Sequence, residues 1–144
     1  MDLAKYRALF LEEATDHLSE MSRALLVLEK QPSETEAIDE VFRMAHSIKG
    51  MAGSLGYDAI TELSHKLEDR MDTYRAAGAI EAGEGIAVLF RGLDGLERMV
   101  AVVAETGEGP EPDPELAEEL SPGRGPGVDA TDVSVPPKKA LRRR

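Results

Sequence analysis

Apolar residues recur at alternating steps of three and four positions over four stretches of the chain. The four stripes are, in chain order, Leu11, Ala14, Leu18, Met21, Leu25 and Leu28; Ile38, Val41, Ala45, Ile48, Ala52 and Leu55; Ile60, Leu63, Leu67, Met71 and Tyr74; and Ile86, Leu89, Leu93, Leu96, Val100 and Val103. This spacing follows the turn of an α-helix and predicts four amphipathic helices, each with one buried face. No segment has the pattern of a β-strand.

Residues with turn and capping preferences separate the stripes. Pro32 lies between the first two, and Ser33, with Glu36 three positions later, is suited to cap the second helix. Gly56 follows the second stripe as a C-terminal cap, and Asp58 is suited to cap the third helix. Because the connections are short, the pattern predicts an all-α fold: an antiparallel up-down four-helix bundle.

Proline marks where the bundle should end. Seven of the eight prolines follow residue 106, and the stretch 107–144 is poor in apolar residues. We therefore expect a bundle over residues 1–106 and a flexible linker or tail over 107–144, with one or two helical turns near 114–120. The basic residues at 138–144 suit either an interaction patch or a solvated end without a role.

Composition excludes several classes of function. The formal net charge of -11 disfavours nucleic-acid binding, and the absence of cysteine removes disulfides and thiolate chemistry. No apolar run is long enough for a membrane span, and no secretory signal is visible, so the expected compartment is the cytoplasm. The 144 residues also leave no room for a nucleotide-binding catalytic domain beside the bundle.

The candidate chemistry lies in the second helix, around His46. At about 100° per residue, the apolar stripe of this helix centres about 130° away from His46, which therefore points outward. Gly50 and Gly53 lie beside it on the next turns, and Phe42 and Lys49 flank it. Two glycines inside a helix each cost roughly 1 kcal/mol relative to alanine, and they leave a bare surface that another protein could approach closely.

Other interpretations of these residues remain open at this point. A lone surface histidine is usually only solvated, and glycines inside a helix can serve contacts between helices. The glycines do not form a phosphate-binding loop, because they lie within a helix and match neither nucleotide-binding pattern.

The third helix carries a second cluster, His65 and Glu68. His65 points well away from the apolar stripe, while Glu68 lies on its flank, about 100° from the centre. A carboxylate there can reach the neighbouring helix and accept a hydrogen bond from one imidazole nitrogen. That bond would fix the tautomer and leave the other nitrogen with a free lone pair, as a nucleophile requires. The alternative is a solvated glutamate.

These residues together resemble a known family, the histidine phosphotransfer (HPt) domains, and among them the N-terminal P1 domains of chemotaxis histidine kinases of the CheA type. The resemblance covers roughly residues 3–105. It rests on Ala45-His46-Ser47-Ile48-Lys49-Gly50 followed by Gly53 and Gly56, and on Phe10-Leu11-Glu12-Glu13-Ala14, His17-Leu18, Leu28-Glu29, Val41-Phe42-Arg43, and the pair His65 and Glu68.

The resemblance implies a role for each residue. His46 would be phosphorylated through Nε2, Glu68 would hold the hydrogen on Nδ1, Lys49 would help to neutralise the phosphoryl group, and His65 would support the same site. Gly50, Gly53 and Phe42 would face the partner.

The partners implied are the ATP-binding domain of a histidine kinase, as donor, and an aspartate of a response-regulator receiver, as acceptor. ATP and Mg²⁺ would belong to those partners, so no cofactor or metal is expected in this chain. The other domains of such a kinase are absent from its 144 residues. It is thus expected to be a piece of a kinase, a truncated product or a stand-alone HPt protein.

Three rival functions remain. A structural helical adaptor would make His46 incidental. An enzyme using His46 and Glu68 as an acid-base pair would need a concave pocket, which an exposed helix face does not offer. A metal-binding bundle would need the repeated Glu-x-x-His pattern of di-iron bundles, which the three histidines lack.

Overall fold

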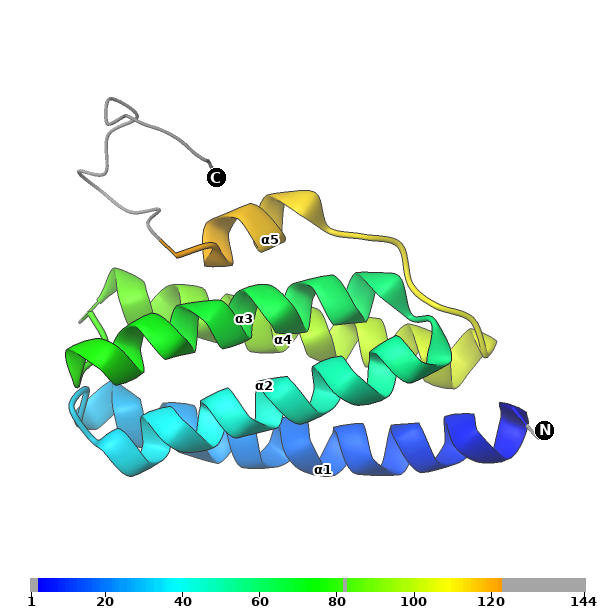
Figure 1. Ribbon diagram of the computed structural model, residues 1–144, viewed down its shortest axis with the longest axis horizontal. Helices are drawn as coiled ribbons and strands as arrows, with labels where there is room; N and C mark the ends of the chain where they lie inside the picture. The colour runs from blue at the N-terminus through cyan, green and yellow to red at the C-terminus, as the bar shows by residue number, and fades with distance from the viewer. Residues whose placement is uncertain (1–2, 82, 123–144) are drawn as a thin grey trace.

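Each predicted stripe forms one long helix of the computed structural model, which describes residues 3–81 and 83–122. The helices are α1 (Leu3–Lys30), α2 (Thr35–Leu55), α3 (Asp58–Ala77) and α4 (Glu84–Thr106), followed by the short α5 (Pro114–Leu120) (Figure 1). No strand occurs among the described residues. The prediction of an all-α antiparallel bundle is confirmed.

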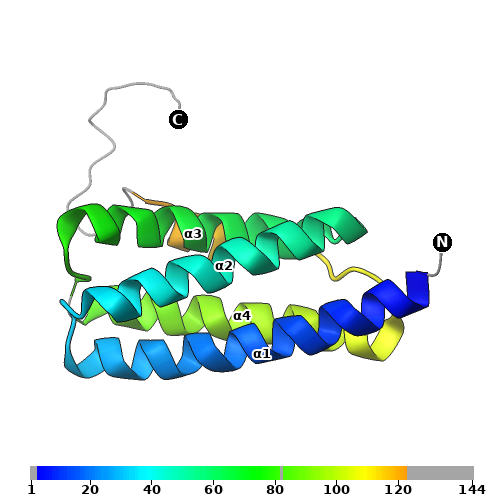
Figure 2. The ribbon, with the colours of Figure 1, turned by 60° about the horizontal axis from the view of Figure 1, so that its bottom comes forward.

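The four long helices form a closed ring. Each packs against its neighbours in sequence, and α4 closes the ring against α1 (Figure 2). The stripes meet at the centre, where nearly all their residues are buried. Only Leu11, Leu55 and Ile86 are partly exposed, because they lie toward the ends of the bundle or at the edge of a stripe. The core thus leaves the outer faces of the helices free for function.

The helix starts differ from the two predicted caps. Neither helix has a side-chain cap at its N-terminus: α2 begins at Thr35 with Glu34 in the cap position, and α3 begins at Asp58 with Tyr57 in that position. A turn at residues 32–33 carries the chain past Ser33 before α2 begins. Tyr57 is held beside Phe10, with ring centroids 5.4 Å apart. Asp58 therefore lies within the first turn of α3 instead of before it.

The helix end at Gly56 follows the prediction. Gly56 has a left-handed backbone with φ of 79°, and its N–H donates to the carbonyls of Ala52 and Gly53. Glycine adopts this conformation without the steric cost that other residues incur. The sharp end of α2 returns the chain directly into α3, so that the two helices pack side by side.

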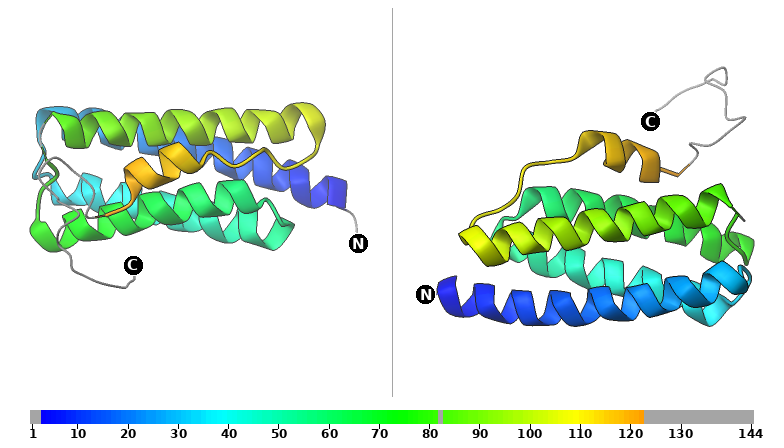
Figure 3. Two further views of the ribbon diagram at one scale, coloured as in Figure 1. Left: turned by 90° about the horizontal axis from the view of Figure 1, so that it is seen from above. Right: turned by 180° about the vertical axis from the view of Figure 1, so that it is seen from behind.

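The boundary predicted at residue 106 needs correction, because the packed unit continues to Leu120. Helix α5 lies against α3 and α4, and its side chains Leu116, Ala117 and Leu120 are buried (Figure 3). It is capped by Asp113, whose Oδ1 accepts from the Leu116 N–H at 3.2 Å. The helical turns expected near 114–120 are present as α5, but they pack on the bundle and do not belong to a flexible tail. The predicted basic patch at 138–144 lies outside the described residues.

Two glycines of α4 allow α5 to approach closely. A methyl group at Gly95 would collide with the Leu116 side chain, and one at Gly92 would lie 3.1 Å from the Leu120 side chain. The buried Arg70 of α3 secures the far end of α5, since its guanidinium donates to the Glu119 carbonyl at 3.1 Å. Helix α5 therefore covers the seam between α3 and α4, on the opposite side of α3 from α2.

Candidate functional site

His46 lies on the outer face of α2, beside the seam with α3. Its neighbours Ala45 and Ile48 are fully buried, so the core-facing side of the helix is fixed by packing. The His46 side chain is 63% exposed. The structure therefore places the imidazole where the helical angles predicted it, pointing into solvent from a rigid helix.

Glu68 of α3 reaches across the seam to His46. Its Oε2 lies 2.5 Å from His46 Nδ1, although the glutamate side chain is only 10% exposed. Because an ionised carboxylate can only accept, Nδ1 carries the hydrogen and donates it to Glu68. In the neutral ring Nε2 then keeps its lone pair, and no described residue occupies it with a hydrogen bond. A ring in this state is a nucleophile directed outward.

Lys49 completes the cluster from the next turn of α2. Its Nζ donates to Glu68 Oε1 at 2.5 Å, so the two carboxylate oxygens serve two different donors. The lysine is 28% exposed and lies on the same surface as the imidazole. The expected role beside an incoming phosphoryl group stays a prediction; the geometry adds a direct ion pair with Glu68.

The electrostatics keep Glu68 ionised. Burial by itself would raise the pKa of this carboxyl, but hydrogen bonds from Lys49 and His46, with their charges, more than offset it, and the pKa is lowered from the ordinary value of 4.5. The group that orients the imidazole is therefore a carboxylate throughout the physiological range.

The surface beside His46 is bare because of its glycines. A methyl group added at Gly50 would meet nothing within 4 Å, and one at Gly53 would make only an ordinary contact of 3.8 Å with Thr61 Oγ1. Neither glycine is thus required for packing between helices. This removes the alternative in which they serve helix contact, and it leaves an open surface on the turns that follow the imidazole.

Phe42 lies one turn before His46, and its ring is nearly parallel to the imidazole. The centroids are 6.4 Å apart and the planes differ by 11°. The Arg75 guanidinium of α3 lies over the Phe42 ring, 4.1 Å from its centroid. Sequence reasoning missed Arg75, although it follows Glu68 by seven positions and therefore shares its face of α3.

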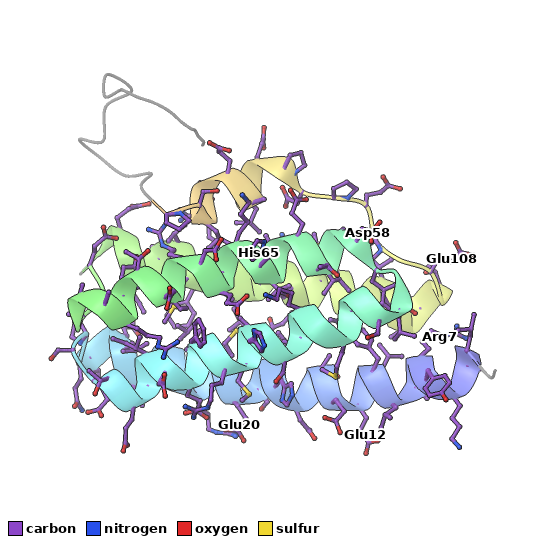
Figure 4. The ribbon with its side chains drawn as sticks, viewed as in Figure 1. Arg7, Glu12, Glu20, Asp58, His65 and Glu108 are labelled. Atoms are coloured by element: carbon purple, nitrogen blue, oxygen red, sulfur yellow. The ribbon has the colours of Figure 1, made fainter. Side chains whose placement is uncertain are left out.

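The structure does not bring His65 to this cluster. His65 lies on the edge of α3 away from α2 (Figure 4), and its Nε2 is 3.4 Å from Asp69 Oδ2, one turn along the same helix. The side chain is displaced by about 60° around the helix from Glu68. The expectation that His65 shares the hydrogen-bonded site of His46 is therefore not supported by the contacts.

No metal centre is apparent in the described part of the chain, where no three histidine or acidic side chains gather as ligands would. No helix among the described residues is both long and apolar enough to cross a membrane.

The family model of the Hpt domain matches residues 5–106, which include His46, Lys49 and Glu68. The chain belongs to the Hpt domain family. It is 35% identical over 109 residues to the chemotaxis protein CheA of Bacillus subtilis, covering 76% of this chain and 16% of that protein. It is 34% identical over 103 residues to CheA of Halobacterium salinarum, covering 72% of this chain and 15% of that protein. The chain thus spans about a sixth of these relatives.

Solved structures place this Hpt domain among those of CheA proteins. The CheA phosphotransferase domain from Thermotoga maritima is 33% identical with a TM-score of 0.64, covering 72% of this chain and 98% of that one. The phosphorylated P1 domain of CheA3 from R. sphaeroides, solved in complex with CheY6, is 25% identical with a TM-score of 0.73, covering 81% of this chain and 92% of that one. The expected resemblance to CheA P1 domains is confirmed.

Proposed function

We propose that this Hpt domain carries a phosphoryl group on Nε2 of His46, between the ATP-binding domain of a CheA-type histidine kinase and an aspartate of a response regulator. The observation that carries the proposal is the hydrogen bond from His46 Nδ1 to Glu68 beneath an otherwise exposed imidazole. It fixes the tautomer in which Nε2 is the free nucleophile.

In the first step, the Nε2 lone pair attacks the γ-phosphorus of ATP. The new N–P bond forms as the bond from phosphorus to the bridging oxygen breaks, and ADP leaves with that electron pair. The Nδ1 hydrogen stays on the ring, where the Glu68 carboxylate stabilises the positive charge that develops. Lys49, on the same surface, is placed to offset the charge of the phosphoryl oxygens.

In the second step, a carboxylate oxygen of the receiver aspartate attacks the same phosphorus. The P–N bond breaks and its electron pair returns to Nε2, which restores the neutral imidazole with its hydrogen on Nδ1. The domain supplies a positioned nucleophile on a rigid helix, and the open surface at Gly50 and Gly53 admits the partner.

ATP and Mg²⁺ belong to the partners in this proposal, so the domain is a carrier and substrate, with no cofactor of its own and no enzyme activity alone. Two comparisons support this division: the chain is similar to CheA over the Hpt region, and a related P1 domain has been solved with CheY6. We assign the domain to the cytoplasm, where ATP is available as the phosphodonor.

The two main rivals fit the site less well. An acid-base enzyme would enclose its substrate, whereas the imidazole is 63% exposed on a convex helix face. A purely structural adaptor has no use for two helix glycines where a methyl group would fit without a clash, nor for a buried carboxylate directed at one histidine.

The proposal is tested by labelling the chain with a CheA catalytic domain, Mg²⁺ and γ-labelled ATP. Wild-type protein should gain one acid-labile, alkali-stable phosphoryl group, as a P–N bond requires, and His46→Gln should gain none. Because His46 is exposed, the variant should keep the circular dichroism spectrum and melting temperature of wild type. Labelling of His46→Gln at the wild-type rate would refute the assignment.

A further inference from the structure

One hydrogen bond does not fix the imidazole of His46 completely. The bond to Glu68 holds Nδ1, but the ring is still able to swing about that contact, since most of the side chain is exposed. Transfer to phosphorus needs the Nε2 lone pair aligned with the bond being broken, so the plane of the ring matters as well as its tautomer.

Phe42 supplies a surface that defines this plane. Its ring lies parallel to the imidazole within 11°, one turn earlier on the same helix, at a centroid distance within the range of offset stacking. Phe42 is partly buried and packs against the hydrophobic core. It is therefore anchored in the core on one side and lies alongside the imidazole on the other.

Arg75 holds Phe42 from the neighbouring helix. Its guanidinium carbon is 4.1 Å from the Phe42 centroid, close enough for a cation–π contact. Arg75 also forms ion pairs, with Nε 3.2 Å from Asp39 Oδ1 of α2 and NH1 3.7 Å from Asp72 Oδ1 of α3. These ion pairs tie the guanidinium to both helices that carry the site.

We propose that Phe42, held by Arg75, is a positioning residue that fixes the plane of the His46 imidazole for phosphoryl transfer. Glu68 thus determines that Nε2 of His46 keeps its lone pair, and the Phe42–Arg75 stack determines the direction in which that lone pair points. The inference rests on the proposed function of His46 and gives Phe42 a role other than the partner contact expected from the sequence.

The test uses two phosphodonors, because they separate positioning from docking. A CheA catalytic domain must dock on the Hpt domain before it can phosphorylate His46, whereas the small molecule phosphoramidate needs no docking surface. In the reaction with phosphoramidate, its P–N bond breaks, ammonia leaves, and the phosphoryl group is bonded to Nε2 of His46. Wild-type labelling at His46 by the kinase establishes the carrier function independently of Phe42, so the two proposals fail separately.

Phe42→Leu should slow labelling by both donors, by roughly 3- to 10-fold. Phe42→Tyr should restore most of the rate because it restores the aromatic face. The matched control is Phe90→Leu, which trims a partly buried phenylalanine packed on the same core but on α4. A slowing with the kinase alone, an equal slowing in Phe90→Leu, or failure of the tyrosine to restore the rate would each overturn the positioning role.

Arg75→Gln gives a second test that leaves the core intact. It should slow labelling by both donors by roughly 2- to 5-fold. In NMR spectra it should also move the ring-proton resonances of His46, since the stacked ring shifts. Arg91→Gln is the control, because Arg91 is similarly exposed and also bridges two carboxylates, those of Glu84 and Glu119. Unchanged rates and unchanged His46 resonances in Arg75→Gln would overturn the inference.

Discussion

A single buried carboxylate organises the site at the scale of residues. Glu68 uses one oxygen for His46 and the other for Lys49, both at 2.5 Å. Charge-assisted bonds of this kind are among the stronger hydrogen bonds in proteins, and here they also repay the cost of burying the carboxylate. Removing Glu68 would therefore release both the nucleophile and the nearest cation.

We expect Glu68→Ala to slow phosphorylation of His46 by roughly 10- to 1000-fold, the scale of losing ring orientation and activation. Initial rates with a CheA catalytic domain measure the effect. Glu68→Gln is the matched variant, because it keeps the shape but removes the charge, and it should fall between alanine and wild type. A wild-type rate in Glu68→Ala would mean that the imidazole does not depend on this contact.

Substitution of Glu68 by glutamine should also change how the unfolding free energy depends on pH. Because the pKa of Glu68 is lowered by folding, its ionised form stabilises the native state above the ordinary value of 4.5, and this contribution is lost as the pH falls through the lower native value. The difference in unfolding free energy between wild type and Glu68→Gln, from urea titrations, should therefore narrow below about pH 4.5. A constant difference down to pH 3 would contradict the cause given for the shift.

Helical periodicity accounts for how much of the site the sequence could predict. Rotation by 100° per residue placed His46 outside and Glu68 on the flank that faces α2, and both positions hold in the structure. Periodicity cannot give the rotation of a side chain. It therefore missed the ion pair of Lys49 with Glu68 and the contact of Arg75 with Phe42, which depend on how α2 and α3 pack.

One or two helical turns near 114–120 were expected, but the packing of helix α5 on the bundle was missed because its signal is short. Seven residues with buried Leu116, Ala117 and Leu120 are too few for a periodic stripe, and the surrounding prolines and glycines are typical of a linker. The sequence signal for this helix is local. Asp113 is a favourable N-cap residue, and Pro114 is favourable at the first position of a helix. Its docking place, formed by Gly92 and Gly95, appears only once α4 is folded.

The glycines of α2 should show opposed effects on stability and on function. Because a methyl group at Gly50 meets nothing, Gly50→Ala should raise the unfolding free energy by about 0.5 to 1 kcal/mol. It should also slow transfer to a receiver several-fold, because the methyl group protrudes one turn from His46, where the partner approaches. Denaturant titration and transfer kinetics measure the two effects.

Gly95→Ala is the contrasting control on α4. Its methyl group would collide with Leu116 of α5, so this variant should lose stability, whereas it should not directly affect transfer from His46. If Gly50→Ala transferred at the wild-type rate, the bare surface would have no part in docking.

Helix α5 should contribute measurably to the stability of the bundle. A chain ending at Thr106 exposes the surface under Leu116 and Leu120 and leaves the buried Arg70 without its carbonyl partners. We expect a loss of about 2 kcal/mol in unfolding free energy, after the entropy regained by the freed segment. A chain ending at Pro122 keeps α5 and is the control against which the loss is measured. Equal stability of the two shortened chains would show that α5 adds nothing.

At the scale of the whole molecule, one flank of α3 serves packing and the other carries the functional site. One flank meets α5 and α4 and is covered, while the other meets α2 and carries the site.

The molecule also has a net charge of -11, so a free polyphosphate is repelled by most of its surface. Lys49, the lysine in contact with the site, is already paired with Glu68. This arrangement disfavours capture of free ATP by the isolated domain.

We therefore expect that the isolated chain neither binds ATP measurably nor labels itself from it. Incubation with γ-labelled ATP and Mg²⁺ alone should leave His46 unmodified, since nothing in the described residues would align the triphosphate with Nε2. Adding a CheA catalytic domain should load His46. Adding a receiver with Mg²⁺ should then remove the label, and a receiver lacking its acceptor aspartate should not. Self-labelling at His46 in a preparation free of kinase would contradict the carrier function and show that the chain itself catalyses the transfer.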